Sequence, residues 1–129
     1  EMQRSLVGSE MCKETVPNTG RNIVQEAIAT FVLVFAICGL GQVPELNDGV
    51  GKLLVFGIIV SIGMSLGGLT GYALNPARDL GPRIAHAILP IKGKGSSNFK
   101  YGLIVPIFGP IIGGLLAVLL YNVIPWAAV

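Results

Sequence analysis

The side chains that could interact with a small polar molecule are gathered in residues 71–79, which read GYALNPARD. Asn75 is a favourable helix N-cap, because its side-chain oxygen can accept from an unpaired N–H of the first turn. Pro76 suits the first helical position, where its missing N–H has no cost. The stretch therefore predicts irregular backbone followed by an abrupt helix start that carries Arg78 and Asp79.

This arrangement has a particular meaning at membrane depth. Irregular backbone and charge are tolerated there only when they are buried in protein or line a water-filled cavity. The helix start carries the equivalent of about half a positive charge, which opposes cations. The amide of Asn75 and the guanidinium of Arg78 can both donate hydrogen bonds to water or a hydroxyl. An alternative is a loop and amphipathic helix lying at the membrane surface.

The composition indicates a membrane protein. The chain has 129 residues, of which 52% are hydrophobic and 12% are charged. A soluble domain normally has about twice that charged fraction. The 18 glycines also suit close packing between membrane helices. The net charge of +2 gives no indication of a nucleic-acid partner.

Three apolar runs must position the polar stretch. Residues 22–41, 52–70 and 101–124 are each long enough to cross a hydrocarbon core of about 30 Å. The re-entrant region spans 71–89, and its helical part is too short and too charged to cross. Asp79 and Arg83 lie four residues apart and can pair on one helix face. We expect an all-α, multi-pass cell-membrane protein with three transmembrane helices and one re-entrant half-helix.

Asn75-Pro76-Ala77, followed by Arg78-Asp79, resembles the second Asn-Pro-Ala box of the aquaporin family. Asp79 in that place resembles the glycerol-conducting branch, as does Pro110 within the sequence FGPI. The resemblance covers roughly residues 20–125. It implies the C-terminal half of an aquaporin-like right-handed helical bundle, with the repeat at 22–126 and residues 1–21 as an extramembrane loop or leader.

The resemblance also implies roles for individual residues. The expected selectivity filter contains Gly63, Tyr72 and Arg78. The carbonyls of Gly71, Tyr72 and Ala73 would line one wall of the pore beside the Asn-Pro-Ala motif. Glycine widens the constriction, and tyrosine offers an apolar face to the carbon chain of a polyol. The structural alternative for Arg78 is a buried ion pair with Asp79 or Glu26.

Glu26 is an acidic residue within the first apolar run. A carboxylate within a membrane usually faces the protein interior, where it is paired or hydrogen-bonded. The resemblance implies that Glu26 accepts hydrogen bonds from the backbone of the re-entrant loop. The alternative is that Glu26 lies at the membrane interface, since it is near the start of the run.

The resemblance implies a passive channel for glycerol, water and small polyols or urea, without cofactor or metal. Its expected partners are membrane lipid, a missing N-terminal half and, once complete, three further copies in a homotetramer. One alternative is a truncated, non-conducting module that packs through glycine-rich faces. Another is an intramembrane enzyme using Arg78, Asp79 and His86. We expect no enzyme, because no Ser or Cys lies near His86 in the sequence and there is no metal-ligand cluster.

The orientation in the membrane is ambiguous from the sequence. The family topology places 1–21 and 90–100 outside the cell, with 42–51 and the C-terminus inside. The basic residues gather in the two outside segments, which conflicts with the positive-inside rule. We keep the family topology as the expectation.

Overall fold

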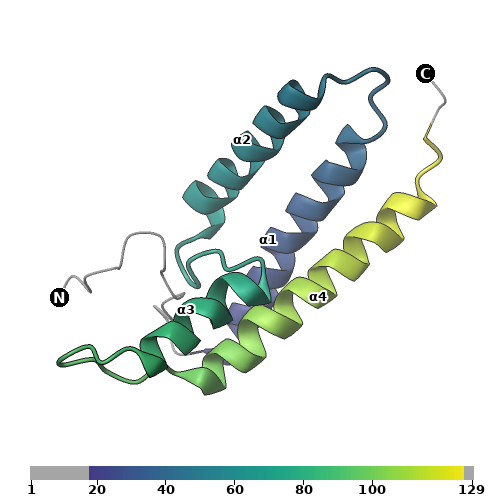
Figure 1. The fold of residues 1–129 in the computed structure, drawn as a ribbon. Helices are drawn as coiled ribbons and strands as arrows, with labels where there is room; N and C mark the ends of the chain where they lie inside the picture. Colours follow the sequence, from purple (N-terminus) through teal and green to yellow (C-terminus); the bar gives the residue numbers. More distant parts are fainter. Residues whose placement is uncertain (1–17, 127–129) are drawn as a thin grey trace.

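The computed structural model describes residues 18–126, and these form four helices without a strand (Figure 1). The helices are α1 (Thr19–Leu40), α2 (Asp48–Leu66), α3 (Pro76–Ile88) and α4 (Phe99–Val123). Because α1, α2 and α4 are long and apolar enough to cross a membrane, the predicted fold class is confirmed. The expected leader falls largely on residues 1–17, which lie outside the described residues.

Helices α1 and α4 form the main packing interface of the described chain and lie side by side (Figure 1). Two glycines of α4 make this approach possible. A β-carbon on Gly113 would stand 2.0 Å from the carbonyl oxygen of Ala27, and one on Gly109 would stand 2.6 Å from Cβ of Glu26. Backbone therefore meets backbone here, as small residues four apart permit.

Helix α2 packs less extensively than α4 against the other described helices. Within residues 18–126 it approaches only α1 among the helices, and Ile62 is its one buried residue. A β-carbon on Gly57 would meet no described atom within 4 Å. Gly57, in the middle of α2, is therefore not used for packing within this part of the chain.

The ends of α2 follow from local chemistry. Its first turn is capped by Asn47, whose side-chain oxygen accepts from the N–H of Gly49 at 2.9 Å. The helix consequently begins at Asp48 rather than at the predicted Lys52. It ends at Leu66 instead of residue 70, since the chain then turns and the N–H of Gly71 donates to the carbonyl of Gly67 at 2.9 Å.

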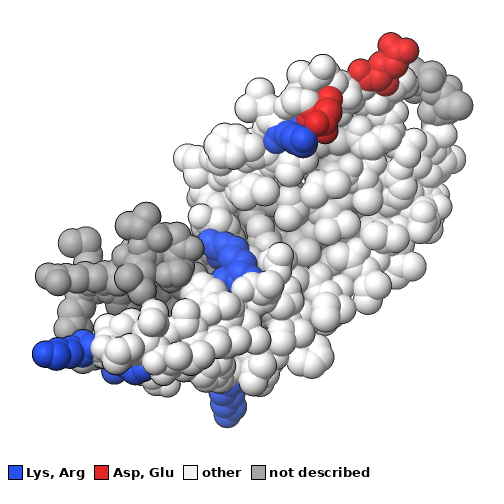
Figure 2. Space-filling model, viewed as in Figure 1, with Lys and Arg blue, Asp and Glu red and all other residues white. Residues whose placement is uncertain are grey.

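Charged groups gather at the two ends of the molecule, and one further basic group lies between them on a mostly uncharged surface (Figure 2). The α1–α2 connection and the start of α2 carry the acidic residues Glu45 and Asp48, and Lys52 pairs with Asp48. The α3–α4 connection carries exposed lysines at positions 92 and 94. This distribution suits helices that cross a membrane and end on opposite sides of it.

Candidate functional site

The segment between α2 and α3 has an unusual backbone. Tyr72 and Leu74 have positive φ angles of 44° and 55°, and Gly71 has a φ of 73°. Side chains other than glycine rarely adopt this left-handed region. Such a backbone persists where the surrounding structure holds it, and it is frequent at functional sites.

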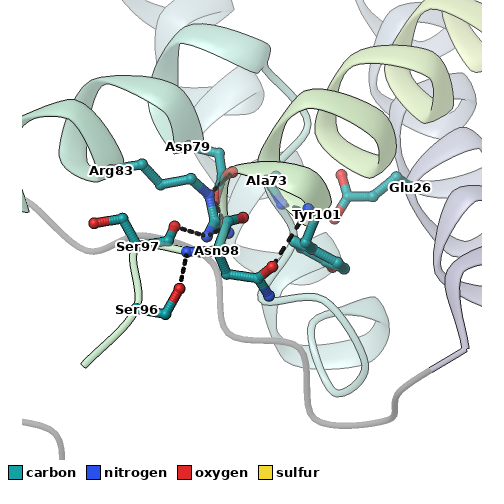
Figure 3. A network of polar contacts seen from close by, with 8 residues as sticks. All are labelled: Glu26, Ala73, Asp79, Arg83, Ser96, Ser97, Asn98 and Tyr101. Atoms are coloured by element: carbon teal, nitrogen blue, oxygen red, sulfur yellow. Dashed lines mark hydrogen bonds and ion pairs between the residues drawn. The ribbon is translucent and has the colours of Figure 1, made fainter. Parts of the chain in front are cut away.

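Glu26 of α1 holds this segment in place. Its carboxylate is 0% exposed. Oε1 accepts from the N–H of Ala73 at 2.9 Å and from the hydroxyl of Thr70, and Oε2 accepts from the N–H of Leu74 at 2.7 Å. The expected hydrogen bonds from the loop backbone are present, and Figure 3 shows Glu26 facing Ala73. Glu26 therefore faces the protein interior.

The helix start follows the sequence prediction closely. Asn75 is extended, with φ −148° and ψ 122°, and its side-chain oxygen accepts from the N–H of Ala77 at 2.9 Å. Pro76 occupies the first helical position. The cap engages the oxygen of the Asn75 amide, so its NH₂ group is the side that can donate to another molecule.

Arg78 and Tyr72 lie together. The guanidinium carbon of Arg78 is 4.9 Å from the centre of the Tyr72 ring, a distance typical of a cation–π contact. Nη1 of Arg78 also donates to the carbonyls of Gly71 and Tyr72, at 3.4 Å each. The arginine is therefore directed back along the irregular segment.

Gly63 completes this group. A β-carbon on Gly63 would stand 3.1 Å from Cζ of Tyr72, and one on Gly67 would stand 2.7 Å from Cδ1 of the same ring. The ring therefore lies on a side-chain-free surface at the carboxyl end of α2. The structure brings together Gly63, Tyr72 and Arg78, which are the three residues expected to form a filter.

Asp79 contacts a different arginine. Oδ2 of Asp79 is 2.6 Å from Nε of Arg83, and Oδ1 accepts from Nη2 at 3.1 Å. The two side chains are 0% and 2% exposed, and their predicted pairing is confirmed. The carboxylates considered as partners for Arg78 are thus engaged with Arg83 and with the loop backbone.

Arg83 has a wider structural role that the sequence reasoning missed. Its Nη1 donates to the carbonyls of Ser97 and Asn98, at 2.8 Å and 3.2 Å (Figure 3). A β-carbon on Gly102 would stand 2.4 Å from both Cδ and Nε of Arg83, so α4 needs glycine there. Arg83 therefore ties α3 to the start of α4.

Lys94 and His86 were also missed. Nζ of Lys94 donates to the carbonyls of His86, Ala87 and Leu89 at 2.7–3.0 Å, which closes the carboxyl end of α3. Nδ1 of His86 lies 2.8 Å from Oγ of Ser97. No serine is near His86 in the sequence, but the α3–α4 connection folds back onto the helix and brings Ser97 against it.

A last missed contact joins α1 to α2. Nε2 of Gln25 donates to the carbonyl oxygen of Leu66, the final residue of α2, at 2.5 Å. Gln25 is adjacent to Glu26. Consecutive residues of α1 therefore contact the two ends of the segment that carries Tyr72.

The exposure of the site is uneven. Glu26, Ala73 and Asp79 are buried, whereas Asn75 and Arg78 are exposed on the side that residues 18–126 leave open. The buried groups fix the backbone, and the exposed ones present donors beside a helix N-terminus. No cluster of three metal-binding side chains occurs within the described chain. The arrangement can bind the oxygen atoms of small neutral molecules and repel cations.

Comparison with known proteins gives a family match. Residues 2–121 match the model of a family described as "Major intrinsic protein". The chain is 56% identical over 108 residues to the glycerol uptake facilitator protein of Bacillus subtilis, covering 84% of this chain and 39% of the relative. It is 56% identical over 103 residues to a probable glycerol uptake facilitator protein of Thermotoga maritima, covering 80% and 43% respectively. A third relative, glycerol uptake facilitator protein 3 of Lactiplantibacillus plantarum, is 53% identical over 104 residues. The chain thus spans less than half the length of these relatives.

Proposed function

This chain belongs to the major intrinsic protein family, and we propose that it supplies one half of a membrane pore for glycerol, related small uncharged solutes and water. The single observation that carries the proposal is the contact of Gly63, Tyr72 and Arg78 beside the start of α3. The family assignment replaces the alternative of an intramembrane enzyme. It also agrees with three helices able to cross a membrane, and the chain is an integral membrane protein.

Selection of neutral solutes would begin at Arg78. Its guanidinium stays charged and offers several donors, so it can bind hydroxyl groups while repelling cations. The Tyr72 ring beside it gives the C–H groups of a polyol an apolar surface. Gly63 carries no side chain and so leaves room for the ring to pack against α2. Together these groups favour a molecule with hydroxyls along one edge and carbon along the other.

Passage past the helix start would use Asn75 and the irregular segment. The Asn75 NH₂ group can donate to a solute oxygen, and the α3 dipole adds positive potential at the same point. Gly71 and Tyr72 each accept from Arg78, and the Tyr72 carbonyl has a second lone pair for a passing hydroxyl. Ala73 is buried and its carbonyl accepts from the N–H of Asn75 at 2.6 Å, so this carbonyl would serve the loop rather than the solute.

The remaining parts of the pore would come from outside this chain. We propose that residues 22–126 act as one repeat that pairs with another half carrying a second Asn donor and a further filter aromatic. Inverted repeats of this kind are common in membrane transport proteins. The complete channel would be a homotetramer in membrane lipid, with the α3–α4 connection on the outer side.

A chimeric channel tests this function. Residues 19–124 replace the corresponding segment of the Bacillus subtilis glycerol uptake facilitator protein, and the purified chimera is reconstituted in liposomes. Stopped-flow light scattering then measures glycerol and water permeability against empty liposomes. Glycerol flux clearly above the empty control supports the proposal. A chimera that inserts in the membrane but shows no glycerol flux, with or without water flux, refutes the proposal.

A further inference from the structure

We infer that Gln25 is a positioning residue that sets the width of the proposed pore aperture bordered by the Tyr72 ring and Arg78, an inference that rests on the proposed function. Gln25 does not itself line the aperture in this account. It acts through the carboxyl end of α2, to which its amide donates a hydrogen bond.

The contact satisfies a backbone group that the helix leaves without an intrahelical partner. The last four carbonyls of any α-helix have no donor within the helix, and Leu66 is the final residue of α2. At membrane depth an unsatisfied carbonyl is costly, because no bulk water is available. The side-chain amide of Gln25 supplies a donor from the neighbouring helix α1 at 2.5 Å.

The same end of α2 backs one side of the proposed aperture. The Tyr72 ring packs against Gly63 in the last turn of α2 and against Gly67, the residue that follows Leu66. The backbone of Tyr72 is held through Ala73 and Leu74 by Glu26. Adjacent residues of α1 therefore support the ring: Glu26 holds its loop, and Gln25 holds the helix end behind it.

Few other described contacts would replace the hydrogen bond from Gln25. Among the helices of residues 18–126, α2 approaches α1 alone and buries only Ile62. Loss of the Gln25 donor would therefore let the helix end separate from the loop. Gly63 would then no longer back the Tyr72 ring, the ring would move away from Arg78 toward α2, and the aperture would admit larger polyols.

The experiment uses the chimeric channel and two substitutions of Gln25. Gln25→Met keeps the length of the side chain but removes the donor. Gln25→Asn keeps the amide but is one methylene shorter, so it does not reach the carbonyl of Leu66. The matched control is Gln42→Met, which removes another side-chain amide contact, the one from Gln42 of the α1–α2 connection to the hydroxyl of Tyr121 of α4. That contact lies away from the aperture, next to the α1–α2 connection.

The readout is the ratio of erythritol to glycerol permeability, measured beside the amount of inserted protein. We expect both Gln25 variants to raise this ratio about threefold or more, as loss of one interhelical hydrogen bond allows, and Gln42→Met to leave it unchanged. A conducting chimera whose ratio is the same with and without the Gln25 substitutions overturns this inference alone. A parent chimera without glycerol flux overturns the proposed function and this inference together. An equal rise in Gln42→Met would assign the effect to general loosening and also overturn it.

Discussion

The ring of Tyr72 lies directly against Gly63: a β-carbon added to Gly63 would stand 3.1 Å from Cζ of that ring. This is closer than side-chain carbons normally approach, so any side chain at position 63 must displace the tyrosine. Arg78 lies on the same ring, with its guanidinium carbon 4.9 Å from the ring centre. A substitution at Gly63 should therefore shift the Tyr72 ring and, through it, the guanidinium of Arg78.

Gly63→His combined with Tyr72→Cys should lower glycerol permeability of the chimera more than water permeability. The imidazole fills the opening, and the apolar face for the polyol is lost. We expect the glycerol-to-water ratio to fall about tenfold, which corresponds to about 1.4 kcal/mol in the barrier. Gly57→Ala in the same helix is the control, because its β-carbon meets no described atom within 4 Å. Equal losses of the two fluxes at unchanged insertion would place positions 63 and 72 outside the constriction.

Arg78→Val should weaken the barrier to ions. The substitution removes a fixed positive charge beside the N-terminus of α3, leaving only the partial charge of the helix. Proton and sodium currents across chimera-containing bilayers measure the effect, and we expect them to rise above those of the parent. Arg21→Val, an exposed arginine at the start of α1, is the control. Unchanged ion exclusion with intact solute flux would remove Arg78 from the filter.

Glu26→Gln should destabilise the irregular segment. An amide in place of the carboxylate turns one of the two acceptor oxygens into a donor, which then faces the N–H of Ala73 or Leu74. A buried N–H left without an acceptor costs about 1–3 kcal/mol. Thermal unfolding in detergent should show a lower midpoint temperature for this variant than for the parent. The control Glu45→Gln alters an exposed residue of the α1–α2 connection and should leave the midpoint unchanged. A midpoint equal to the parent's would mean that Glu26 does not hold the loop.

Gly113→Ala and Gly114→Ala should differ although they are neighbours. The added β-carbon at 113 would collide with the backbone of Ala27, at 2.0 Å from its carbonyl oxygen. At 114 the nearest neighbour is a methyl group of Val34 at 3.9 Å, an ordinary contact. Overpacking of this kind costs about 1–3 kcal/mol. Thermal unfolding should separate the two variants, and equal stability would contradict the close α1–α4 packing.

The sequence was sufficient to predict the fold class and the helix start at Asn75. Apolar runs, an N-cap and a proline at the first helical position are local signals, and the chain folds as they indicate. The pairing of Asp79 with Arg83 was predictable for the same reason, since both lie on one helix at a spacing of four. The roles of the proposed filter residues came from the family resemblance and stay predictions.

Contacts between distant segments were not predictable from local patterns. Gln25 reaches Leu66 only because α1 and α2 are antiparallel neighbours, and spacing along the chain does not encode that distance. Lys94 closes α3 because the following connection folds back. The start of α4 depends on Asn98, which adopts a left-handed backbone with a φ of 44°. Each of these contacts can be predicted only once the tertiary arrangement is known.

The central claim is that this chain forms one wall of a pore that another half must complete. The most direct test compares glycerol-driven swelling of empty liposomes, liposomes with residues 1–129 alone, and liposomes with the chimera. We predict swelling for the chimera and only the empty-liposome rate for residues 1–129, because one half supplies only one wall of the pore. Swelling by residues 1–129 clearly above the empty control, and abolished by Arg78→Val, would contradict it.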